Sequence, residues 1–155
     1  MKGQIVHILL VEDDEIDAEA IVRGFQKQQV ENPITVVPNG IEALNALRGE
    51  GSYERIPAPY LILLDLNMPR MNGIEFLQSL RQDPQLKSSI VFVLTTSDSD
   101  RDKLAAYREQ IAGYLLKQRS GVNFIELVNM LDSYWRIVEF PPEERTWLHS
   151  PLSAV

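Results

Sequence analysis

The chain has 155 residues, the length of one ordinary domain. Hydrophobic residues make up 45% and charged residues 24%, which excludes a mostly disordered chain. There is no cysteine, so disulfides, thiolate metal sites and cysteine nucleophiles are excluded. The net charge of −7, from 22 acidic and 15 basic residues, argues against binding to nucleic acid.

No apolar run approaches the roughly 20 residues that a membrane-spanning helix needs. The first residues also lack the basic start, apolar stretch and small-residue cleavage site of a secretory leader. We therefore expect a cytoplasmic protein that binds neither a membrane nor nucleic acid.

Strand and helix patterns alternate through the first part of the chain. Residues 5–11 form an apolar, β-branched run typical of a strand that is buried on both faces. Residues 12–14 are acidic, and a helix follows with Asp14 or Asp17 near its N-terminus. The helix shows apolar residues at helical spacing: Ala18, Ile21, Val22 and Phe25. Residues 34–37 predict a second strand, and residues 43–47 a second helix that ends before Gly49.

Three further strand–helix pairs follow. Strands are predicted at residues 60–64, 90–94 and 113–116, and they end at Asp65, Thr95 and Lys117. The third helix carries Ile74, Leu77 and Leu80 on one face and ends at Asp83-Pro84. Ser97 and Asp100 resemble a capping box for a fourth helix that runs to about Tyr107, and a fifth helix spans about 123–137.

Five strand–helix units in strict alternation predict an α/β fold with a parallel sheet covered on both faces. In such sheets, ligands bind beyond the carboxyl ends of the strands. The residues predicted at that edge are three acids, one hydroxyl and one amine: Glu12, Asp13, Asp65, Thr95 and Lys117. Neighbouring carboxylates repel, and a hard divalent cation relieves the repulsion, so the cluster predicts Mg²⁺ or Mn²⁺. A carboxylate beside such a cation can act as a nucleophile toward phosphorus.

The segments that carry these residues resemble the receiver domain of bacterial response regulators. They are residues 8–14, 63–69, 72–73, 93–96 and 113–117. The resemblance covers about residues 5–138 and implies a flavodoxin-like, doubly wound (βα)5 receiver with strand order 2-1-3-4-5. Residues 139–155 form an extension that is too short for an output domain, so a single-domain regulator is implied.

The resemblance implies a role for each matching residue. Asp65 would accept a phosphoryl group from the histidine of a sensor kinase, and Thr95 and Lys117 would bind that group. Asp13, Asp65 and the backbone carbonyl of Asn67 would bind Mg²⁺, with Glu12 assisting through water. Thr95 and Tyr114 would form a switch pair that reshapes the surface around the last strand.

Within the superfamily, the chain looks most like the single-domain regulators of phytochrome histidine kinases. The Leu-Thr-Thr-Ser segment, the Leu-Lys pair without a following proline and the aromatic C-terminal extension carry this resemblance. Most receivers have a cis proline after the lysine, whereas Gln118 follows Lys117 here. A cis bond before a non-proline residue costs about 2.5–4 kcal/mol, so we expect a trans bond or an altered loop.

Simpler and rival interpretations have less support. Residues 12–14 alone could be a helix-capping acidic cluster, but Asp65 and Lys117 at matching strand ends favour a site. An aspartate-nucleophile phosphohydrolase usually needs Asp-x-Asp, and Asn67 stands where the second acid would be. A flavodoxin needs a phosphate-binding loop after the first strand, where this chain has acids that would repel phosphate.

The last part of the chain suggests a partner surface. Both tryptophans, Trp135 and Trp147, lie within the last 21 residues, and the Pro141-Pro142 pair is expected to send the chain outward. An apolar segment beyond the domain's own core needs a cover. The expectation is a homodimer in which each extension packs across the other subunit; the alternative is an extension that folds back on its own domain.

Overall fold

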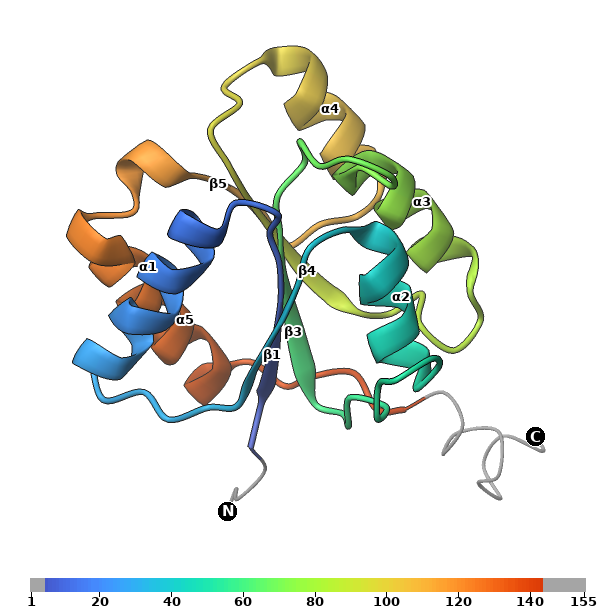
Figure 1. The fold of residues 1–155 in the computed structure, drawn as a ribbon, viewed down its shortest axis with the longest axis horizontal. Helices are drawn as coiled ribbons and strands as arrows, with labels where there is room; N and C mark the ends of the chain where they lie inside the picture. Colours follow the sequence, from blue (N-terminus) through green and yellow to red (C-terminus); the bar gives the residue numbers. More distant parts are fainter. Residues whose placement is uncertain (1–4, 144–155) are drawn as a thin grey trace.

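The computed structural model describes residues 5–143, and a parallel five-stranded sheet lies at its centre (Figure 1). The strands are β1 (His7–Val11), β2 (Ile34–Val37), β3 (Tyr60–Leu64), β4 (Ile90–Thr95) and β5 (Gly113–Leu116). The helices are α1 (Glu15–Lys27), α2 (Gly40–Arg48), α3 (Gly73–Gln82), α4 (Asp100–Arg108) and α5 (Ile125–Ile137). Two short 3-10 helices, η1 (Lys117–Arg119) and η2 (Val122–Phe124), join β5 to α5.

The strand order β2-β1-β3-β4-β5 confirms the predicted doubly wound topology. Helices α1 and α5 cover one face of the sheet, and α2, α3 and α4 lie on the other side (Figure 1). None of the helices within residues 5–143 is both long enough and apolar enough to cross a bilayer.

The central strands supply two cores because successive side chains point to opposite faces of the sheet. Leu9 and Val11 of β1 pack on the side of α2 and α3, whereas Ile8 and Leu10 pack on the side of α1 and α5. β3 and β4 divide their side chains in the same way. Burial on both faces explains why these strands read as continuous apolar runs.

Polar caps fix where the helices begin. The Asp14 side chain accepts hydrogen bonds from the backbone N–H groups of Ile16 and Asp17 at the start of α1. Asn72 and Glu75 form a reciprocal capping box that begins α3 directly after the loop following β3. These caps place the helix starts beside the carboxyl ends of the strands.

Two predicted boundaries are wrong for local reasons. Ser99, not Ser97, caps α4, because its side chain accepts the Asp102 N–H, while the Ser97 hydroxyl donates to the Asp102 carboxylate. α5 begins at Ile125 rather than near Asn123, since Asn123 and Phe124 have positive φ angles of 54° and 59°.

The start of the C-terminal extension folds back on its own domain. Phe140 makes an edge-to-face contact with Tyr134, at 6.2 Å between ring centroids, and Trp135 stacks on Phe25. Pro141-Pro142 does not send the next residue outward, because Glu143 pairs with Arg55 of the same domain. Trp135 and Phe140 are thus partly covered by their own domain. Trp147 lies outside the described residues, and the expected homodimer stays a prediction.

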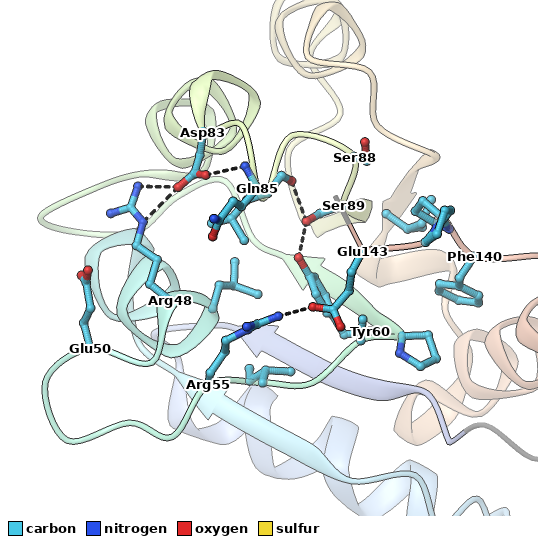
Figure 2. A pocket seen from close by; sticks show the side chains of 18 residues that line it. Arg48, Glu50, Arg55, Tyr60, Asp83, Gln85, Ser88, Ser89, Phe140 and Glu143 are labelled. Atoms are coloured by element: carbon cyan, nitrogen blue, oxygen red, sulfur yellow. Dashed lines mark hydrogen bonds and ion pairs between the residues drawn. The ribbon is translucent and has the colours of Figure 1, made fainter. Parts of the chain in front are cut away.

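Residues 140–143 line a cavity of about 280 Å³ near the amino ends of the strands (Figure 2). Glu143 pairs with Arg55 of the loop between α2 and β3, and Arg48 pairs with Asp83 at 3.1 Å. Both arginine charges in this cavity are thus matched by carboxylates.

We predict that Gly24→Ala destabilises the domain. Alanine normally stabilises a helix by about 0.5–1 kcal/mol relative to glycine. At position 24 of α1, however, a Cβ would lie 2.4 Å from the carbonyl oxygen of Asn123 in η2. We expect a loss of about 1–3 kcal/mol in the free energy of unfolding, measured by urea denaturation.

Glu19→Ala is the matched control, because Glu19 lies exposed on the same helix. It should change stability by less than about 0.5 kcal/mol. A Gly24→Ala variant as stable as the parent would contradict the close approach of η2 to α1.

Candidate functional site

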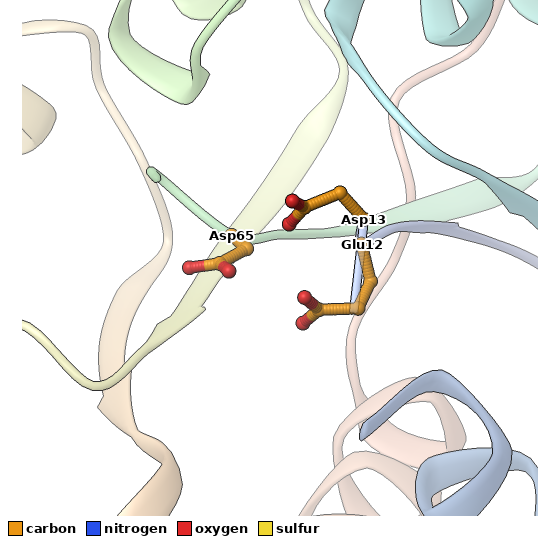
Figure 3. Close-up of side chains that lie close together, drawn as sticks. All are labelled: Glu12, Asp13 and Asp65. Carbon is orange, nitrogen blue, oxygen red and sulfur yellow. The ribbon is translucent and has the colours of Figure 1, made fainter. Parts of the chain in front are cut away.

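Three carboxylates meet at the carboxyl edge of the sheet. Glu12 and Asp13 follow β1, and Asp65 follows β3, the neighbouring strand. The Asp65 N–H donates to the carbonyl of Val11 at 3.0 Å, which extends the strand pairing to the site. One oxygen of each carboxylate lies within 4.8 Å of the others, and all three groups face one small space (Figure 3).

Burial makes this cluster electrostatically costly. Glu12 and Asp65 are buried, while Asp13 is exposed. Burial, together with the charge of Asp65, raises the pKa of Glu12 to about 7 despite its hydrogen bond with Lys117. An additional positive charge among these oxygens would favour the ionised form of Glu12.

Lys117 supplies one positive charge from the end of β5. Its Nζ lies 2.8 Å from Glu12 Oε1, 2.7 Å from Asp17 Oδ2 and 3.5 Å from Asp65 Oδ2. Burial of the side chain opposes the charged form, but the hydrogen bonds to Asp17 and Glu12 and the charge of Asp65 raise the pKa of Lys117 above its usual value. The ammonium is therefore firmly protonated and shared among carboxylates.

Asp17 was not predicted as part of this group. It lies in the first turn of α1, where the sequence suggested only a helix-capping role. The available signal was its position: the first turn of a helix that follows a parallel strand lies at the edge where ligands bind. What the sequence alone could not show is that Lys117 reaches across from β5 to this turn.

Thr95 and Tyr114 are linked through one residue of the loop between β4 and α4. Thr95 is fully buried, and its Oγ1 accepts the backbone N–H of Ser97 at 3.3 Å. Tyr114 Oη donates to the Ser97 carbonyl at 2.8 Å. The two predicted switch residues therefore hold the backbone of Ser97 from both sides, a connection that the sequence did not indicate.

Two remaining expectations concern loops. Asn67 is exposed two residues after Asp65, and the participation of its carbonyl stays a prediction. Within residues 5–143 the only cis peptide bond precedes Pro59, so the bond between Lys117 and Gln118 is trans, as expected. The backbone after Lys117 turns into η1 instead.

The donor set fits a hard divalent cation. Three carboxylates from two adjacent strand ends offer oxygen ligands, and oxygen is what Mg²⁺ and Mn²⁺ prefer. A cation there would also favour the ionised form of Glu12, whose pKa is raised by burial and by the charge of Asp65.

The sequence profile of the family described as the response regulator receiver domain matches residues 8–130. The chain belongs to this family. Its matched region contains Glu12, Asp13, Asp65, Thr95 and Lys117, so the carboxylate cluster and the lysine lie inside the shared domain.

This receiver domain has well-covered relatives. Response regulator Rcp1 of Synechocystis sp. (strain ATCC 27184 / PCC 6803 / Kazusa) is 36% identical over 128 residues, 83% of this chain and 87% of Rcp1. The crystal structure of the Mn²⁺-bound form of Rcp1 matches with a TM-score of 0.77 and 35% identity, covering 88% of this chain and 99% of that chain. The phosphorylated cyanobacterial phytochrome response regulator RcpA matches with a TM-score of 0.80 and 32% identity, covering 90% and 100%.

We predict that the metal-free domain loses stability as the pH rises from about 5 to 7. Folding raises the pKa of Glu12 from 4.5 to about 7, so the folded state binds the proton more tightly than the unfolded state. The free energy of unfolding should fall by about 1–3 kcal/mol across this window, and by less in Glu12→Gln. Urea denaturation in a chelating buffer measures the effect.

Glu15→Gln is the control, because Glu15 is an exposed acid at the start of α1. This variant should keep the full pH dependence. A Glu12→Gln variant that keeps the same fall would contradict the assignment to Glu12.

Proposed function

We propose that this chain is a single-domain response regulator whose Asp65 accepts a phosphoryl group from a sensor histidine kinase in a Mg²⁺-dependent reaction. The observation that carries the proposal is the position of Asp65, buried between the Glu12–Asp13 pair and the ammonium of Lys117. It signals through protein contacts or a phosphorelay, and it catalyses only its own phosphorylation and dephosphorylation.

The transfer forms one bond and breaks another. A carboxylate oxygen of Asp65 attacks phosphorus, the bond between phosphorus and the kinase histidine breaks, and the ring nitrogen leaves with the bonding electron pair. Lys117 and the hydroxyl of Thr95 donate to oxygens of the transferred group. Asp13, Asp65 and the Asn67 carbonyl would hold Mg²⁺ or Mn²⁺, with Glu12 assisting through water, and the cation would supply charge neutralisation.

The output depends on Thr95, Ser97 and Tyr114. Once the Thr95 hydroxyl turns toward the phosphoryl group, it no longer accepts the Ser97 N–H. Tyr114 still holds the carbonyl of Ser97, so the loop between β4 and α4 shifts and the Tyr114 ring turns inward. The supporting observation is that both side chains bind the backbone of this one residue.

The kinase partner is a phytochrome, and the protein acts in the cytoplasm without binding nucleic acid or a membrane. RcpA is a cyanobacterial phytochrome response regulator, and RtBRR, a bacteriophytochrome response regulator, matches with a TM-score of 0.72 and 33% identity. The net charge of −7 supports the absence of nucleic-acid binding. Phosphotransfer from purified phytochrome kinases tests the pairing directly.

The protein forms a homodimer through the C-terminal end of its extension. Support comes from the sequence, in which Trp147, Leu148 and Leu152 follow the described residues. The proposed dimerisation arm is the extension of residues 139–155. Because residues 140–143 pack on their own domain, we assign the proposed contact to the residues after them.

We predict that Asp65→Asn abolishes phosphorylation. The amide is a poor nucleophile and contributes no negative charge to the cluster. With acetyl phosphate and Mg²⁺, intact-protein mass spectrometry should show one added phosphoryl group on the parent and none on Asp65→Asn. The same should hold with a kinase as donor.

Asp14→Asn is a matched control that removes one nearby carboxylate. Asn caps a helix as well as Asp does, so α1 should stay intact. This variant should be labelled like the parent. Undiminished labelling of Asp65→Asn would refute the assignment of the acceptor.

We predict that deletion of residues 144–155 converts a dimer into a monomer. The deletion removes Trp147 but leaves Phe140 and the Arg55–Glu143 ion pair in place. Sedimentation velocity of the full chain and the truncated chain measures the masses, and circular dichroism checks that both are folded. The same oligomeric state for both chains would exclude residues 144–155 as the dimer contact.

A further inference from the structure

Lys117 pairs with carboxylates of two kinds: members of the candidate metal cluster, and one carboxylate outside it. Its contacts to Glu12 at 2.8 Å and Asp65 at 3.5 Å involve members of the candidate metal cluster. Its contact to Asp17, at 2.7 Å, is the shortest of the three and involves a residue outside that cluster. Asp17 is thus the carboxylate that can pair with Lys117 without giving up a metal ligand.

The position of Asp17 is set by the start of α1. The Asp14 side chain accepts the Asp17 N–H at 3.1 Å, which fixes the first turn directly after Glu12 and Asp13. The Asp17 side chain is one-third exposed, whereas that of Lys117 is 8% exposed. A buried ammonium depends on its carboxylate partners because little water is available to solvate it, so loss of one partner is costly.

Lys117 and a divalent cation would draw on the same carboxylates. In the described geometry the ammonium already contacts one oxygen of Glu12 and one of Asp65. A cation held by this cluster would bind the same two carboxylates and would repel the ammonium. Both positive charges can remain in the site only if Lys117 keeps a carboxylate of its own.

We propose that Asp17 is a positioning residue that holds Lys117 beside Asp65 while a divalent cation occupies the Glu12–Asp13–Asp65 cluster. The inference rests on the metal site of the proposed function and deepens it. Without Asp17, Lys117 has only Glu12 and Asp65 as charged partners within residues 5–143, and it would compete with the cation for them. Asp17 therefore strengthens cation binding without contacting the cation.

The test is the Mg²⁺ affinity of the full chain at neutral pH, measured by calorimetric titration without a phosphoryl donor. Asp17→Asn should weaken Mg²⁺ binding about tenfold, and Asp17→Glu should recover part of the loss. Glu15→Gln removes the same charge from the same helical turn but has no ion pair within residues 5–143. It should weaken binding less than about threefold, through general electrostatics alone.

The same pair of variants in a Lys117→Met background isolates the lysine. There Asp17→Asn and Glu15→Gln should have equal effects, because no ammonium remains to compete. Equal effects in the presence of Lys117 would overturn the inference, as would a larger effect of Asp17→Asn in the Lys117→Met background. Failure of the parent to bind Mg²⁺ would instead contradict the metal site of the proposed function, and circular dichroism excludes unfolding in each variant.

Discussion

The repulsion among the carboxylates of Glu12, Asp13 and Asp65 is the constraint on which the site depends. Adjacent parallel strands bring these groups together, and burial leaves Glu12 and Asp65 little contact with water. One ammonium from β5 offsets part of this repulsion, but burial together with the charge of Asp65 still raises the pKa of Glu12, so an energetic deficit remains. The carboxyl edge of the sheet therefore favours binding of a further cation and, next to that cation, of an anionic phosphoryl group.

The fold was largely predictable because its signals are local and repeated. Continuous apolar runs such as residues 60–64 indicate strands buried on both faces, and their alternation with amphipathic helices leaves few topologies. Helix boundaries were less predictable where several polar residues could each act as the N-cap. Ser97 and Ser99 both satisfy the sequence requirement for an N-cap, and only the backbone path decides between them. The positive φ angles of Asn123 and Phe124 depend on packing against Gly24 of α1, which no local pattern indicates.

The site was predictable to the extent that strand ends define it. Asp65 and Lys117 were expected at one edge because the strands are parallel, and their contact lies there. The remaining contacts of the site are made by long side chains and by the backbone of a loop. Asp17 joins the group because Lys117 reaches over from the last strand of the sheet, and Ser97 matters through its backbone N–H and carbonyl. Residue type alone predicts neither contact.

Residues 140–143 lie at the edge of the sheet opposite the candidate site. These residues leave the domain near the amino ends of the strands, whereas Asp65 lies at the carboxyl ends (Figure 1). A strand of five residues separates the two ends by about 17 Å, and the intervening sheet is tightly packed. A protein that contacts residues 140–143 and the Arg55–Glu143 ion pair would therefore leave the carboxylate cluster at the opposite edge of the sheet uncovered.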